Sequence, residues 1–168
     1  MIQIDTLTQG YDAVEDRLFI DVRDAAGAVL RLWLTRRLAD AVFGHLCDWL
    51  QRSRSRGDAG FDQLLHSWDQ QAAQAGLRSG EPVRWQGEAV LLVAVDFTQT
   101  DQGCQLVFKT QLAGQQQPVA AVTFTLVQLR QWLGIVHRLY APAGWPEDIW
   151  PDWLHNAVRA AEAAPTAD

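Results

Sequence analysis

A strand, a tight turn, a second strand and a capped helix follow one another between Arg17 and Leu50, and no other feature constrains the fold as much. Both strand segments alternate apolar and polar residues, which is the period of a strand with one buried face. The alternating apolar residues are Leu18, Ile20 and Val22, then Leu30, Leu32 and Leu34. Thr35 can cap the helix, because its hydroxyl can accept a hydrogen bond from a backbone N–H of the first turn. The segment therefore predicts a β-hairpin that leads into an amphipathic helix.

The same order recurs later in the chain, between Gln105 and Tyr140. Two alternating segments again flank a turn, here at Gly114, and Thr125 again precedes a helical pattern. A first strand at Ile2–Leu7 has a counterpart at Val90–Phe97, so that each half reads strand-strand-strand-helix. Such internal similarity is the signature of a structural repeat.

We therefore predict an α+β fold in a single domain of 168 residues. Its sheet is expected to be antiparallel and built from two pseudo-repeat halves, about 1–52 and about 88–140, with the helices packed on one face. An inserted helix is expected at about 61–75 and a C-terminal helix at about 147–163. The apolar side of the inserted helix consists of Phe61, Leu64, Leu65, Trp68, Ala72 and Ala75.

Three more local expectations follow from residue type. Gln9–Asp12 is rich in turn formers and predicts a turn. The continuous apolar run Ala89–Val95 predicts a strand that is buried on both faces. The chain contains eight tryptophans, which bring large buried area and mark partner surfaces when exposed. Three of them, Trp145, Trp150 and Trp153, could dock the last helix on the body of the protein or on a second subunit.

Composition narrows the class of protein. The chain is 48% hydrophobic and 20% charged, which suits a globular core. Its N-terminus lacks a signal-peptide pattern and it has no membrane-length apolar run, so a cytoplasmic protein is expected. Only Cys47 and Cys104 are present, and reduced structural thiols are the expectation. A net charge of −6 disfavours nonspecific nucleic-acid binding, whose affinity comes from phosphate neutralisation.

The residues between the buried positions of the first hairpin form its outer face. Phe19, Arg23, Arg31 and Trp33 should point away from the helices, and Lys109 is the matching cation in the second half. Rings beside arginines can form the core of a subunit or protein interface. They can also stack single-stranded bases. A third possibility is that another part of the chain covers them.

A basic loop is expected after the first helix, with Arg52, Arg54 and Arg56 in it. These arginines could contact phosphate groups. They could equally form a solvated linker whose charge lies near a helix C-terminus, where cations are favoured.

The doubled strand-strand-strand-helix order, with a threonine before each helix, resembles that of the Whirly and Pur-alpha class of single-strand nucleic-acid binders. The resemblance covers topology over about two-thirds of the chain and no specific motif. It implies that the outer sheet face binds single-stranded nucleic acid. The chain departs from that class in its acidic charge and in the helix expected at 61–75.

No motif for catalysis, a metal or a cofactor is present in the sequence, so no cofactor and no metal are expected. A spatially assembled site around His45 or His137 stays open, because such sites are defined by geometry. We expect a non-enzymatic interaction protein that acts through its outer sheet face, either by homo-oligomerisation or with a protein partner, and without a membrane. Single-stranded nucleic-acid binding and enzymatic activity are the alternatives.

Overall fold

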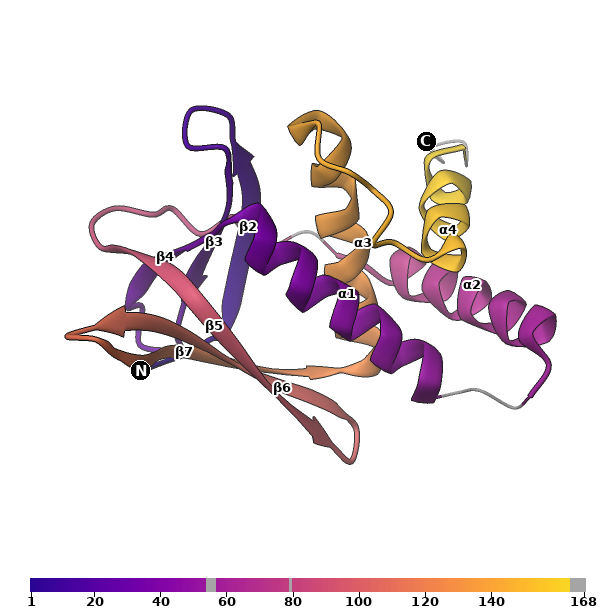
Figure 1. The fold of residues 1–168 in the computed structure, drawn as a ribbon, viewed down its shortest axis with the longest axis horizontal. Coiled ribbons are helices and arrows are strands. Elements are labelled where there is room, and N and C mark those ends of the chain that lie inside the picture. Colours follow the sequence, from indigo (N-terminus) through magenta and orange to yellow (C-terminus); the bar gives the residue numbers. More distant parts are fainter. Residues whose placement is uncertain (54–56, 79, 164–168) are drawn as a thin grey trace. The chain divides into compact units, whose positions relative to one another are not determined.

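The computed structural model describes residues 1–53, 57–78 and 80–163, and the chain forms two compact units (Figure 1). One unit, the sheet unit, consists of Met1–Val42 and Ser79–Leu126. The other, the helical unit, consists of Phe43–Arg78 and Val127–Asp168. The chain therefore leaves the sheet unit in mid-course, builds part of the helical unit, and returns to complete the sheet.

The strands form one mixed sheet of seven within the described residues, in the order β1-β7-β6-β5-β4-β3-β2 (Figure 1). Their bounds are β1 (Ile2–Gln3), β2 (Thr6–Asp12), β3 (Arg17–Arg23), β4 (Val29–Leu34), β5 (Ala89–Thr100), β6 (Gly103–Leu112) and β7 (Gln115–Thr125). The described part of the chain also contains four helices: α1 (Arg36–Ser53), α2 (Ala59–Ala75), α3 (Leu126–Ala143) and α4 (Asp152–Ala163). The protein is thus α+β, as the sequence predicts.

The prediction of a purely antiparallel sheet is wrong. β4 pairs with β5 in parallel, with Arg31 opposite Ala89 and Trp33 opposite Leu91. β1 pairs in parallel with β7. A parallel neighbour requires a long crossover connection, and the chain between β4 and β5 supplies one that contains α1 and α2. Within β2-β3-β4 and within β5-β6-β7 all pairings are antiparallel.

The first hairpin has the burial pattern that its sequence predicts. All six alternating apolar residues of β3 and β4 are buried. Thr35 caps α1 as expected, because its Oγ1 accepts a hydrogen bond from the backbone N–H of Leu38 at 3.3 Å. Asp58 caps α2 in the same way, accepting from the N–H groups of Gly60 and Phe61 at 3.1 Å each.

The turn predicted at Gln9–Asp12 is instead the second half of β2. Gly10 lies in the strand because the ring of Phe19, directly opposite on β3, occupies the space of a side chain. A Cβ atom added to Gly10 would lie 2.5 Å from Cζ of Phe19, well inside van der Waals contact. The glycine thus permits close packing of a ring in a strand, which a local turn propensity does not reveal.

Two other elements differ from expectation. β5 is a strand, but it is not buried on both faces, since Leu91 is 40% exposed and Val93 38% exposed. α4 starts at Asp152 rather than near Glu147. Its first hydrogen bonds are those that the N–H groups of Leu154 and His155 donate to the carbonyl of Pro151. A proline fits just before or at a helix start, where no N–H is needed.

The core of the helical unit is aromatic. Phe43 contacts the ring of Trp132 at 5.2 Å and that of Trp150 at 5.9 Å between centroids. Tyr140 contacts both Trp145 and Trp150. Trp145, Trp150 and Trp153 are all buried within the chain itself, so half of the tryptophans serve internal packing: Trp132, Trp145, Trp150 and Trp153. In the described residues no helix is both long enough and apolar enough to cross a bilayer.

Candidate functional site

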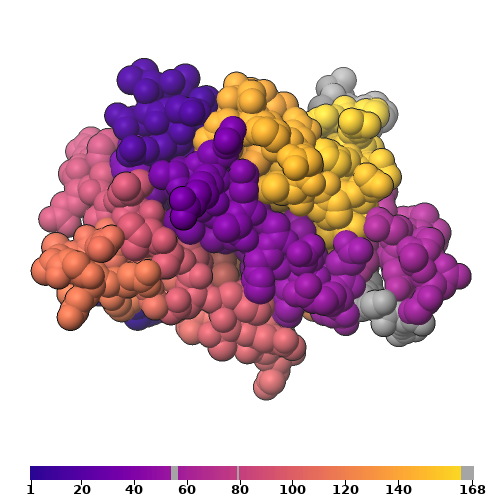
Figure 2. Space-filling view, in the orientation of Figure 1, coloured from indigo at the N-terminus to yellow at the C-terminus, as the bar shows by residue number. Residues whose placement is uncertain are grey.

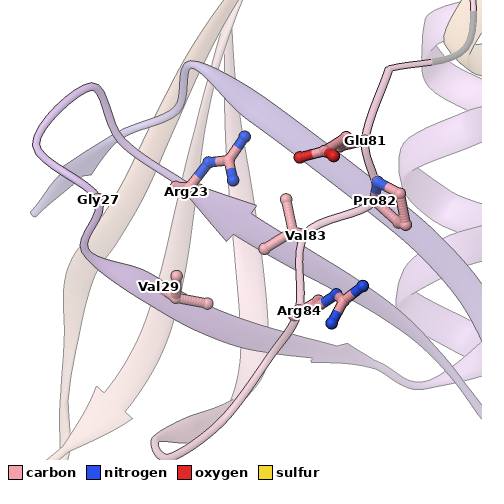
Figure 3. Close-up of a pocket in the computed structure, with 7 residues that line it drawn as sticks. All are labelled: Arg23, Gly27, Val29, Glu81, Pro82, Val83 and Arg84. Carbon is pink, nitrogen blue, oxygen red and sulfur yellow. The ribbon is translucent and has the colours of Figure 1, made fainter.

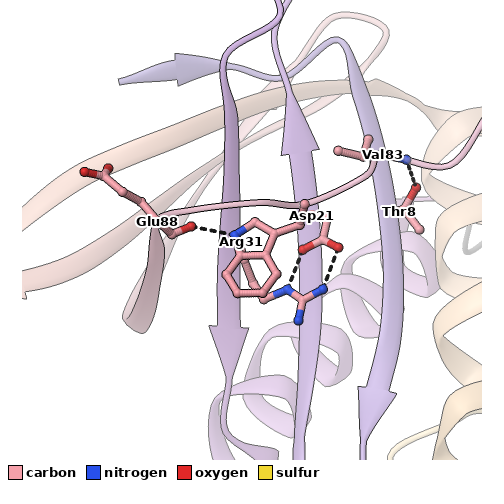
Figure 4. Close-up of polar contacts among 6 residues, drawn as sticks. Thr8, Asp21, Arg31, Val83 and Glu88 are labelled. Atoms are coloured by element: carbon pink, nitrogen blue, oxygen red, sulfur yellow. Dashed lines mark hydrogen bonds and ion pairs between the residues drawn. The ribbon is translucent and has the colours of Figure 1, made fainter.

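The outer face of the sheet unit is organised around an ion pair between neighbouring strands. Arg31 on β4 lies opposite Asp21 on β3. Its Nε and Nη2 donate hydrogen bonds to the two carboxylate oxygens at 2.6 and 2.8 Å (Figure 4). Asp21 is buried and Arg31 is largely so. The hydrogen bond to Asp21 raises the pKa of Arg31 further, so that the guanidinium is always charged. Such a bidentate pair fixes the orientation of the arginine.

Aromatic rings enclose the guanidinium of Arg31. Its Cζ lies 4.2 Å from the ring centroid of Phe19, 4.1 Å from that of Trp85 and 5.1 Å from that of Trp33. Phe19 and Trp33 contact each other edge to face at 6.0 Å. Stacking of this kind is favourable for arginine. The sequence predicted Phe19, Arg31 and Trp33 on one face, and the structure brings them into one cluster.

We name the segment Glu81–Glu88 the strap. It supplies the ring of Trp85, which the sequence did not connect with the outer face. The strap crosses the outer face before the chain enters β5 (Figure 4). Its Val83 N–H donates a hydrogen bond to Oγ1 of Thr8 on β2 at 2.8 Å, and Trp85 Nε1 donates one to the carbonyl of Glu88 at 2.7 Å. Part of the outer face is therefore covered by the chain itself.

Arg23, another of the outer-face residues, lies at a shallow pocket beneath the strap. The pocket has a volume of about 320 Å³ and is lined by Arg23, Gly27, Val29, Glu81, Pro82, Val83 and Arg84. The guanidinium of Arg23 and the carboxylate of Glu81 point toward each other across it (Figure 3). The pocket thus has charges of both signs.

The open part of the outer face lies on β5 and β6. Leu91, which is partly exposed, stands directly opposite Trp33. Lys109 does belong to this sheet, but it forms its ion pair with Asp96 of β5 at 2.5 Å. An apolar strip of Trp33, Leu91 and Val93 is therefore flanked by the Arg31 cluster on one side and an ion pair on the other.

The loop arginines fall mostly outside the described residues. Arg52 is exposed in the last turn of α1. Arg54 and Arg56 lie outside the part of the chain that the structure describes. The phosphate-contact hypothesis for this loop stays a prediction.

A second candidate surface is one face of α2. The exposed residues of this helix are Ala59, Gly60, Phe61, Leu64, Trp68, Gln71, Ala72 and Ala75. The expected apolar side therefore faces outward, whereas Asp62, His66, Gln70 and Ala73 are buried. The helix lies at the surface of the helical unit (Figure 2, in lighter magenta). The sequence identified this apolar side but not the direction in which it faces.

Polar contacts explain why α2 buries its polar side. Gln70 Nε2 donates a hydrogen bond to the carbonyl of Arg130 on α3 at 2.7 Å. Gln131 of α3 donates one to the carbonyl of Ala73 at 3.0 Å. The ring of His66 lies 3.0 Å from a guanidinium nitrogen of Arg130 and stacks near Trp153 of α4. These hydrogen bonds offset part of the cost of burying the polar side, although Oε1 of Gln70 has no hydrogen-bond partner among the described residues.

Of the two histidines considered in the sequence, His45 and His137, the second lies close to other ionisable side chains. Its Nε2 lies 2.8 Å from Nδ1 of His155, and that Nδ1 is 3.9 Å from a carboxylate oxygen of Glu147. Burial lowers the pKa of His137 to about 4, and the positive charges around it act in the same direction. His137 is therefore neutral at pH 7. His45 is exposed on α1.

A scan against protein-family models, a search of curated proteins and a search of solved structures found no match for this chain. Function therefore has to be inferred from the surfaces themselves.

Proposed function

We propose that this protein is a non-enzymatic interaction protein that self-associates through the outward face of α2. The observation that carries the proposal is that three large apolar side chains on one helix face lie open to solvent. Phe61 is 50%, Leu64 45% and Trp68 55% exposed. Contiguous apolar surface of this kind marks interaction sites in soluble proteins.

Charge favours a second copy of the chain as the occupant. None of the exposed residues of α2 is charged, although the chain as a whole carries a net charge of −6. Two copies repel each other at long range, and an uncharged face is where they can approach without opposed like charges. A two-fold symmetric contact places the same face on both partners, which an uncharged apolar helix face satisfies without further complementarity.

The area of the face indicates the strength of the contact. A large aromatic side chain buries about 150–250 Å², so three half-exposed side chains offer roughly 300 Å² per protomer. Two copies would bury roughly 600 Å² from these residues, below the approximately 1,200 Å² at which standard specific interfaces begin. The expected dimer is therefore weak and concentration-dependent.

Sedimentation velocity over a concentration series, from low micromolar to several hundred micromolar, tests the proposal. The wild-type chain should shift from monomer to dimer, and Leu64→Glu should remain a monomer because it would bury two charges in the contact. Val14→Glu is the matched control, since it adds the same charge at an apolar residue that is 94% exposed. A wild-type chain that is monomeric throughout, or a Leu64→Glu variant that dimerises as wild type does, overturns the proposal.

The outer sheet face is the second candidate surface, and a specific observation favours it. Leu91 and Val93 stay exposed beside Trp33, next to an arginine that Asp21 and two rings already hold in place. Preorganised Arg and Trp side chains are typical of interface hot spots. If Leu91→Glu rather than Leu64→Glu abolishes the dimer in the same series, self-association belongs to this face.

The same geometry weighs against single-stranded nucleic-acid binding. The carboxylate of Asp21 neutralises Arg31, the cation at the centre of the aromatic cluster, and Asp96 pairs with Lys109. A cation that is already paired contributes less to phosphate binding.

The proposal also includes an internal repeat and a cytoplasmic location. The order of elements β2-β3-β4-α1 and β5-β6-β7-α3 supports the repeat. The free state of Cys47 and Cys104 supports a reducing compartment.

A further inference from the structure

Three potential ligand groups converge in the helical unit, at the junction of α3 and α4. They are His137 on α3, Glu147 in the connection and His155 in the first turn of α4. One nitrogen or oxygen atom of each lies within 4.8 Å of the others. The sequence gives no sign of this, because successive members are 10 and 8 positions apart.

Buried tryptophans hold the connection that carries Glu147. Trp145 contacts the ring of Tyr140 at 5.3 Å between centroids, and its backbone N–H donates a hydrogen bond to the carbonyl of the same tyrosine. Trp150 stacks on Phe43, and its backbone N–H donates a hydrogen bond to the carbonyl of Glu147 at 3.1 Å. The turn that presents Glu147 is thus anchored on both sides.

We propose that His137, Glu147 and His155 bind a divalent transition-metal ion, for which zinc is the best fit. Two imidazole nitrogens and one carboxylate oxygen are a ligand set that Zn²⁺ accepts, with water in the fourth position. The ring nitrogens are Nε2 of His137 and Nδ1 of His155, and they face each other. His137 is buried, whereas the side chains of His155 and Glu147 are 20% and 37% exposed, so water can reach the site as the fourth ligand.

The distances require a small adjustment. Tetrahedral zinc with bonds of about 2.0–2.1 Å places its ligand atoms roughly 3.3 Å apart. The two nitrogens are now 2.8 Å apart, and Nδ1 of His155 lies 3.9 Å from Oε2 of Glu147. A rotation of the more exposed His155 ring, together with Glu147, brings both distances toward the required value. His137 can remain in place.

The protonation of His137 sets the expected affinity. Its Nδ1 is buried and has no hydrogen-bond partner among the described residues. In the metal-free protein the proton therefore lies on Nε2 and is donated to His155. Metal binding at Nε2 moves this proton to Nδ1, where it faces no acceptor. We expect affinity in the micromolar range rather than that of a closed structural zinc site.

Cobalt titration of untagged, chelator-treated full-length protein tests the site. Co²⁺ should bind at one equivalent and give the intense visible absorption of a tetrahedral nitrogen–oxygen site, and Zn²⁺ should displace it. His155→Gln and Glu147→Gln should each weaken binding at least tenfold. His45→Gln, at an exposed histidine on α1, should bind as the wild-type chain does.

Circular dichroism on each variant shows whether the helices are retained, and the solvent-accessible positions of Glu147 and His155 make this the expected result. If the wild-type chain binds no Co²⁺ at several hundred micromolar, the inference is wrong. It is also wrong if folded His155→Gln and Glu147→Gln bind Co²⁺ as tightly as the wild-type chain. Neither result bears on dimerisation through α2.

Discussion

Arg31 and Asp21 face each other in register on neighbouring strands and share two hydrogen bonds, and this pair fixes the outer face of the sheet unit. The pair orients the guanidinium so that the rings of Phe19 and Trp85 lie about 4 Å from its centre. A charged group thereby becomes the centre of an otherwise aromatic cluster. The strap can cross the sheet because this centre gives Trp85 a place to stack.

Each charge of this pair should be required for stability only as long as the other charge is present. Asp21→Val leaves Arg31 without its counter-charge in a mostly buried place, and should lower the free energy of unfolding by about 2–4 kcal/mol. Adding Arg31→Met should recover most of the loss, because an apolar pair of similar volume needs no charge compensation.

Urea denaturation of the two variants measures this effect. Arg17→Met is the control, since its ion pair with Glu15 is at 3.6 Å on the surface, and it should change stability by less than about 1 kcal/mol. A double variant that is less stable than Asp21→Val would contradict the account of the pair.

The attachment of the strap to the outer face should depend on one side chain, that of Trp85. Trp85→Ala removes the ring over Arg31 and the hydrogen bond to the Glu88 carbonyl. We expect hydrogen exchange at the Val83 amide, which now bonds to Thr8, to accelerate at least about tenfold, equivalent to 1.4 kcal/mol. Exchange in β3 should not change.

Arg84→Ala is the neighbouring control for this measurement, because Arg84 is exposed in the same segment. Equal protection of Val83 in the wild-type chain and in Trp85→Ala would mean that the strap is held by something other than this ring.

What the sequence could predict was local. The alternation of β3 and β4, the cap at Thr35 and the placement of Phe19, Arg31 and Trp33 on one face all follow from spacing along a few residues. Contacts between residues that lie far apart in the sequence could not be predicted. The approach of Trp85 to Arg31 joins positions in separate parts of the chain.

The orientation of α2 shows what an apolar pattern alone does not give. An apolar stripe on a helix predicts the buried face when the polar side of the same helix finds no hydrogen-bond partners inside the protein. Here the polar face finds the carbonyl of Arg130 through Gln70, and the guanidinium of the same arginine through His66. The partners of a buried glutamine cannot be seen from its own neighbours in sequence, so the sequence did not indicate which side of α2 is buried.

Both thiols should be unreactive in the folded protein. Burial raises the pKa of Cys47, with the negative charge of Asp48 acting in the same direction, and burial raises that of Cys104 to about 11. The nucleophile is the thiolate, so its population at pH 8 is very small. Ellman's reagent should label neither cysteine of the native chain within minutes and both in denaturant. Rapid labelling of one equivalent in the native state would contradict this, and Cys104→Ala would identify which thiol had reacted.

Two glycines at matching positions of α1 and α3 should respond in opposite ways to alanine. A Cβ at Gly44 meets no atom within 4 Å among the described residues, so Gly44→Ala should stabilise the protein by about 0.5–1 kcal/mol through helix propensity. A Cβ at Gly134 would lie 1.8 Å from Nε2 of Gln74 and 3.1 Å from Nε2 of Gln70, both on α2. Gln74 can rotate away, but Gln70 is fully buried and bonded to the carbonyl of Arg130. Gly134→Ala should therefore destabilise by about 1–2 kcal/mol.

Thermal and urea unfolding of both variants measure the contrast, and Gln74→Ala combined with Gly134→Ala tests which of the two glutamines causes the loss. Removing the nearer side chain should recover little of the lost stability, because Gln74 can already rotate away and the tight contact with the buried Gln70 remains. The result bears directly on the direction in which α2 faces. If Gly134→Ala stabilised the protein as Gly44→Ala does, the glutamines of α2 would not lie against α3. The apolar stripe of Phe61, Leu64 and Trp68 would then lose the polar anchoring that turns it toward solvent.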